Sequence, residues 1–91
     1  MRAFEVFVNG KKRCVAGVAS DESLSVIACI APDGPFFTVS GSTGPNGDFA
    51  RWVESERIDV GDEIRVRCVD TGRVDEPTSV TKAKRKVTPA K

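Results

Sequence analysis

The sequence predicts a small, single-domain, all-β protein: an antiparallel β-sandwich or barrel, built as a meander of about six strands. Short runs rich in β-branched and aromatic residues recur along the chain. Turn-forming Gly, Pro, Asn and Asp separate these runs about every 8–12 residues. With 91 residues the chain has room for one domain. Every connection is short enough for neighbouring strands to pair, so a meander is the simplest connectivity.

The clearest turn signal lies between the first two predicted strands. Residues 4–8 form a β-branched and aromatic run, Asn9-Gly10 follows, and residues 11–18 return. Asn and Gly both accept the positive φ that a tight hairpin turn requires. We therefore predict a hairpin, with either a two-residue loop or a longer loop and a bulge. Its inward side chains are expected to be Phe4, Val6, Val8, Cys14, Ala16 and Val18.

Residues 24–31 are almost wholly apolar and allow two interpretations. The polar residues before them could cap a helix with an apolar face. The β-branched residues of the run favour a strand, and Pro32 ends the run at strand length. We favour a strand that is buried on both faces and keep the helix as the alternative.

Two further strands, residues 36–40 and 49–53, flank a Gly-rich loop at residues 41–48. Successive Gly amides can bind an anion. No lysine or helix follows at the spacing of a phosphate loop, so we favour a mobile hairpin loop. Residues 54–57 are interpreted as a polar connection.

The last long strand follows the turn at Val60-Gly61-Asp62. Side chains alternate from Glu63 onward, which is typical of a strand with one dry and one wet face. The predicted dry face holds Ile64, Val66 and Cys68, and the wet face Glu63, Arg65 and Arg67. For residues 73–81 we predict a brief extended segment at a sheet edge.

Charge divides the chain into a β-domain at residues 1–81 and a flexible basic tail at residues 82–91. The first part holds nine Lys/Arg and thirteen Asp/Glu, a net charge of −4, and the tail holds five Lys/Arg and no acid, a net charge of +5. Basic segments of this kind attract phosphate backbones. A solubilising terminus without a binding role is the equal alternative.

The composition argues against an enzyme. The chain has no histidine, which removes His-dependent triads, His general bases and His metal ligands. Cys14, Cys29 and Cys68 are widely spaced in apolar runs, so we expect reduced, buried thiols in a cytoplasmic protein. The acids of residues 54–63 are interpreted as a hydrated surface. We therefore expect no cofactor, no metal and no membrane segment.

Two functions from different classes remain. The first is a non-enzymatic module that binds a partner protein, or itself as a homodimer, through a sheet face or edge. Its candidate contact residues are Phe36, Arg51, Trp52, Arg65 and Arg67, although Trp52 also suits a core and the two last arginines suit cross-strand ion pairs. The alternative is a nucleic-acid-binding accessory protein that uses the Arg65 and Arg67 stripe with Lys82, Lys84, Arg85 and Lys86.

Overall fold

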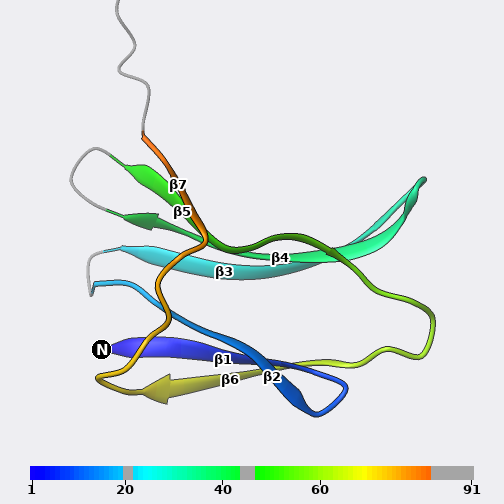
Figure 1. The fold of residues 1–91 in the computed structure, drawn as a ribbon, viewed down its shortest axis with the longest axis horizontal. Helices are drawn as coiled ribbons and strands as arrows, with labels where there is room; N and C mark the ends of the chain where they lie inside the picture. Colours follow the sequence, from blue (N-terminus) through cyan, green and yellow to red (C-terminus); the bar gives the residue numbers. More distant parts are fainter. Residues whose placement is uncertain (20–21, 44–46, 83–91) are drawn as a thin grey trace, which may run out of the picture.

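The computed structural model describes residues 1–19, 22–43 and 47–82, which fold into two facing antiparallel sheets (Figure 1). Within these residues no helix is long and apolar enough to cross a membrane. The seven strands are β1 (Arg2–Val8), β2 (Lys11–Gly17), β3 (Ser23–Ala31), β4 (Gly34–Thr43), β5 (Asp48–Arg57), β6 (Ile64–Asp70) and β7 (Ser79–Thr81). The predicted all-β sandwich is confirmed, and the two sheets do not close into a barrel.

The first sheet has the order β2-β1-β6 and begins with the predicted hairpin. Asn9 and Gly10 both have positive φ, 52° and 82°, which identifies the tight two-residue turn. A register shift between Val6 and Phe7 leaves Arg13 as an extra residue on β2. Arg13 Nε donates a hydrogen bond of 2.6 Å to Glu56 Oε1 on β5 of the other sheet.

The second sheet has the order β3-β4-β5-β7. Residues 23–31 form a strand and not a helix, because β3 and β4 pair without a register shift around the turn at Pro32-Asp33. The Gly-rich segment contributes more strand than expected: β4 runs to Thr43 and β5 begins at Asp48. The polar residues 54–57 likewise extend β5 and are not a connection.

The connectivity is more complex than a simple meander. Consecutive strands pair in β1–β2 and in β3–β4–β5, but β6 returns to pair with β1 and β7 pairs with β5. The chain therefore crosses between the sheets after β2, after β5 and again after β6 (Figure 1). Both sheets contain strands from the first and the second half of the sequence.

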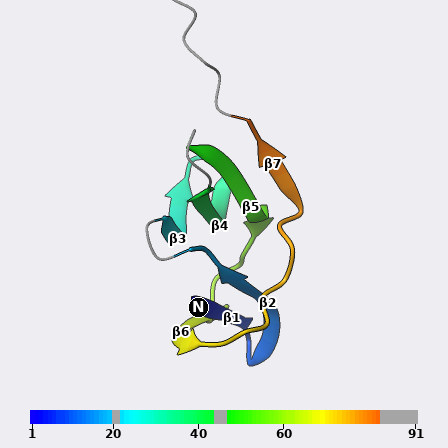
Figure 2. The ribbon, with the colours of Figure 1, turned by 90° about the vertical axis from the view of Figure 1, so that its left-hand side faces the viewer.

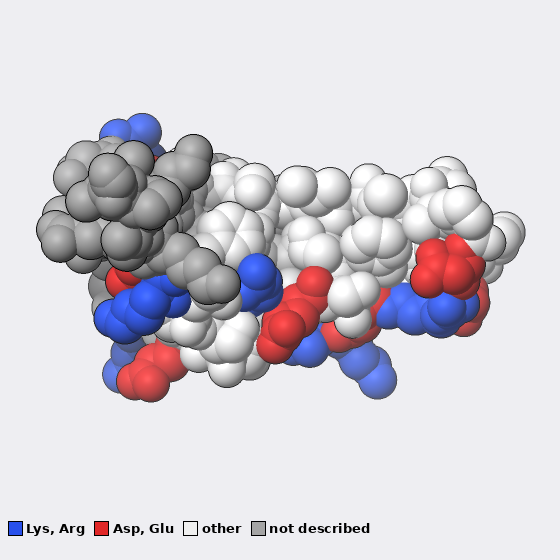
Figure 3. Space-filling model, turned by 90° about the horizontal axis from the view of Figure 1, so that it is seen from above, with Lys and Arg blue, Asp and Glu red and all other residues white. Residues whose placement is uncertain are grey.

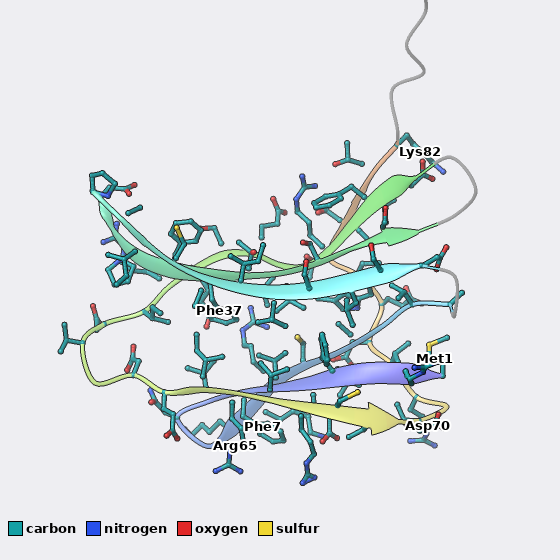
Figure 4. All side chains as sticks on the ribbon, turned by 180° about the vertical axis from the view of Figure 1, so that it is seen from behind. Met1, Phe7, Phe37, Arg65, Asp70 and Lys82 are labelled. Atoms are coloured by element: carbon teal, nitrogen blue, oxygen red, sulfur yellow. The ribbon has the colours of Figure 1, made fainter. Side chains whose placement is uncertain are left out.

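The core lies between the sheets, where Val6 and Ala16 face Phe37 and Val39. Figure 4 shows Phe37 pointing into this space, while Phe7 and Arg65 point away from it. The predicted inward residues of the first hairpin are correct: Val6, Cys14 and Ala16 are buried, and the remaining three pack against the cluster.

Two predicted apolar surfaces are less covered than expected. β3 is not buried on both faces, because Ile27 and Ile30 are 52% and 91% exposed. On β6, Ile64 packs against the core, but Val66 is 41% exposed and Cys68 is exposed. Ile27 lies on the outer face of its sheet and points away from the opposite sheet. Ile30, Val66 and Cys68 lie on edge strands, where the opposite sheet covers a side chain only in part. For β6 the alternating pattern gives the correct inward face but not the position of the strand at the edge of its sheet, and for β3 the prediction of two buried faces is wrong.

One side of the sandwich is spanned by the segment between β6 and β7. The Asp75 backbone amide donates to the Val15 carbonyl at 2.8 Å, and the Val15 amide donates to Asp75 Oδ2 at 2.8 Å. The backbone carbonyl of Asp75 accepts a 2.7 Å hydrogen bond from Trp52 Nε1. Asp75 thereby joins β2 of one sheet to β5 of the other.

Candidate protein-interaction surface

The two long free edges of the sandwich lie on one side of the molecule. Figure 2 shows β3 and β6 stacked on the side opposite to β2, β5 and β7. The outer edge of β2 is engaged by Asp75, and β7 is only three residues long. β3 and β6 therefore present the longest rows of backbone amides and carbonyls available to another chain.

The two edges differ in charge. β6 carries Arg65 and Arg67, and charged side chains on an edge discourage pairing with another strand. The nine residues of β3 contain no charged residue and no proline. The edge of β3 thus lacks two of the features by which edge strands avoid association.

Apolar side chains project from both faces of β3. Ile27 lies on the outer face of the sheet with Ser25 and Cys29, whereas Ile30 lies on the inner face beyond the end of the core. Figure 3 looks down on this outer face; beyond the grey atoms, uncharged residues cover the β3 side and charged residues gather along the β5 side.

The backbone of β3 is orientated so that alternate residues face the free edge. Pro35, the partner of Ile30 on β4, has no amide hydrogen, and its carbonyl accepts a bond from the Ile58 amide on the other side. Ile30 and Pro35 are therefore a non-hydrogen-bonded pair. By the alternation of antiparallel pairs, the residues of β3 whose backbone groups point to the free edge are Leu24, Val26, Ala28 and Ile30.

An apolar groove of about 580 Å³ continues this surface at the end of the sandwich. Ala28, Ile30 and Pro35 line one wall, and Ile58 and Val60 contribute to the other. The turn at residues 59–62 borders this groove. It is held by the Asp62 carboxylate, which accepts hydrogen bonds from the Asp59 backbone amide and from Asn9 Nδ2. These hydrogen bonds lower the pKa of the Asp62 carboxyl.

The structure does not bring the candidate contact residues together. Phe36 is half-buried on the outer face of the second sheet, beside Cys29. Arg51 lies on the same sheet with its guanidinium 4.7 Å from the Phe49 ring centre, and it donates to Thr81. Trp52 is 3% exposed and belongs to the core, which is the alternative that the sequence left open.

The remaining candidates lie on other surfaces. Arg65 and Arg67 are exposed on β6, and Arg67 pairs with Glu5 at 3.7 Å, the cross-strand ion pairing that the sequence favours. Lys82 pairs with Asp48 at 3.5 Å near the end of β7. Lys84, Arg85 and Lys86 lie outside the described residues.

Sequence reasoning missed Ile27, Ile30 and the β3 edge. The signal was present, because residues 23–31 lack charge. β4 also lacks charge, however, and lies in the centre of its sheet. An uncharged strand is therefore compatible with a buried central position or with an edge that another chain covers.

The described residues hold no group of three or more Cys, Asp or Glu side chains placed to bind a metal ion. All three cysteines are free, and Cys14 alone is buried. Comparisons with protein-family models, with curated proteins and with solved structures found no match to this chain. The candidate surface therefore stands on its own geometry.

Proposed function

We propose that this chain is a non-enzymatic protein-interaction module that binds through the free edge of β3. The observation that carries the proposal is a nine-residue edge strand without charge or proline, on which Ile27 and Ile30 are exposed. An added strand would gain main-chain hydrogen bonds from the edge and side-chain contacts from both faces. The proposed setting is the cytoplasm, where free thiols stay reduced.

A photo-crosslinking residue at position 27 tests this proposal in cells that produce the protein. The matched control carries the same residue at position 80, because Val80 is 49% exposed on β7 of the same sheet. We expect a crosslinked product, with a second copy or with another protein, from position 27 only. Equal products from both positions, or none from position 27, would contradict the proposal.

A second candidate function is the binding of nucleic acid, and the outer face of the first sheet favours it. Phe7 lies between Lys12 and Arg65 in the strand register, and Arg67 lies two residues further along β6 on the same face. A ring between basic side chains suits a stacked base beside its phosphates. Glu5 opposes this role, because it pairs with both Lys12 and Arg67.

A gel-shift series with single-stranded oligonucleotides tests the second candidate. Binding should weaken steeply between low and physiological salt. Arg65→Ala should weaken it further, and removal of residues 83–91 should separate the contribution of the tail. No shift at low salt would eliminate this function.

A further inference from the structure

Resting on the proposed function, we infer that the partner of β3 is the β3 strand of a second copy, paired antiparallel about a two-fold axis at Ile27. Two copies of the four-stranded sheet would then form one continuous eight-stranded sheet. The inference follows from the register that β3 can adopt with itself and from the side chains that this register brings together.

The centre of β3 is Ile27, so a two-fold axis at this residue pairs every residue from Ser23 to Ala31. The residues whose backbone groups face the free edge then meet one another: Leu24 pairs with Ile30 of the second copy, and Val26 with Ala28 of the second copy. The two-fold axis repeats both pairs, which makes four. Each pair exchanges two hydrogen bonds, so the dimer gains about eight. A register shifted by one residue, with the axis between two residues, would place these groups opposite residues that face β4. An axis at Val26 or Ala28 would keep the groups matched but would pair fewer residues of the nine-residue strand.

The same register matches the side chains. Ile27 meets Ile27 of the second copy in a non-hydrogen-bonded pair, where side chains lie closest. On the inner face, Ile30, which is 91% exposed, is covered by Leu24 of the second copy. No charge opposes a like charge within the strand, whereas two copies of β6 would bring arginines together.

A symmetric dimer would leave the β3 edge of both copies fully paired. A two-fold contact uses the same patch on both chains and leaves no β3 edge for a third copy. A single strand pair lies at the small end of protein interfaces, below about 1,200 Å² in total. We therefore expect a dimer that dissociates in about the micromolar range.

Sedimentation of the purified 91-residue chain from about 1 to 500 μM tests the association. The wild type should shift from 9.8 kDa to twice this mass with concentration. Ile27→Lys should stay at the monomer mass with an unchanged circular dichroism spectrum, because two lysines would oppose each other at the axis. Val80→Lys is the matched control and should dimerise like the wild type.

A cysteine pair tests the register independently of affinity. The inferred axis places Ser25 opposite Cys29 of the second copy, about 4.5 Å apart at Cα, which is within the range for a disulfide. In a Cys68→Ser background, Ser25→Cys should give a dimer under mild oxidation, and peptide mapping should link position 25 to position 29. The double variant Ser25→Cys, Cys29→Ser lacks the opposing thiol and should not be linked in this way.

The outcomes separate this inference from the proposed function. A monomer at every concentration, without the 25–29 link, overturns the self-pairing. If position 27 still crosslinks another protein in cells, the interaction module stands with a different partner. If position 27 yields no product in cells and the purified chain is monomeric, both proposals fail.

Discussion

At the scale of single residues, burial gives the three thiols different chemistry. Cys14 is 5% exposed, and burial raises its pKa to about 11. Cys68 is exposed on β6, and Cys29 is half-buried on β3. Thiolate is the reactive form, so we expect an alkylating reagent to modify Cys68 readily and Cys14 only on unfolding. Mass spectrometry of the labelled peptides measures this order.

The raised pKa of Cys14 also predicts an alkaline loss of stability. Above about pH 9 the unfolded chain ionises this thiol, whereas the folded protein keeps its proton until about pH 11. The unfolded state then binds fewer protons, so the free energy of unfolding falls across this window, by about 2–3 kcal/mol at most. Urea unfolding of the wild type and of Cys14→Ala from pH 7 to 11 compares the two slopes. Parallel slopes would show that Cys14 does not cause the loss.

At the scale of elements, two turns hold each other at one end of the first sheet. Asn9 in the β1–β2 turn donates to Asp62 and accepts a bond from the Glu63 amide. The Asn9 amide also donates to the Glu63 carbonyl. The Asn side chain therefore serves two purposes, because it tolerates a positive φ and joins its turn to the connection before β6.

This contact predicts a pH dependence that a substitution can remove. Hydrogen bonds from Asn9 and from the Asp59 amide lower the pKa of the Asp62 carboxyl in the folded protein. The ionised carboxylate therefore stabilises the fold above the pKa that Asp62 has in the unfolded chain. This stabilisation is lost as the pH falls through the lower pKa of the folded protein. Asn9→Gly keeps the positive φ and removes the side-chain bond. An NMR titration should show a higher pKa for Asp62 in this variant. An unchanged value would contradict the assignment of Asn9 as the main cause.

Local signals predicted the elements better than their arrangement. Asn9-Gly10 predicts a hairpin because both residues accept a positive φ that few residues adopt, and Pro32 correctly marks the end of the strand before it. The return of β6 to β1 has no local signal, because it depends on how the sheets face each other. For the same reason the sequence could not show that Ile27 is exposed while Phe37 is buried.

At the scale of the whole molecule, Asp75 joins the two sheets through Val15 and Trp52. Asp75→Ala removes the side-chain acceptor of the Val15 amide and should lower the free energy of unfolding by about 1–2 kcal/mol. Asp75→Asn retains an oxygen acceptor and should cost less. Trp52 fluorescence and circular dichroism, followed during urea unfolding, should report one shared transition in both variants. Equal losses in the two variants would show that the side-chain bond contributes little.

The pairing of β1 with β6 also determines the order in which the molecule assembles. The hairpins β1–β2 and β3–β4 close over short loops and can form early, whereas Arg2 must find Asp70 across most of the chain. Closing so long a loop costs entropy before its contacts form, and folds dominated by such pairings take about milliseconds to seconds. Docking of β6 is therefore the expected rate-limiting step, and until it occurs β1 is itself an unpaired edge.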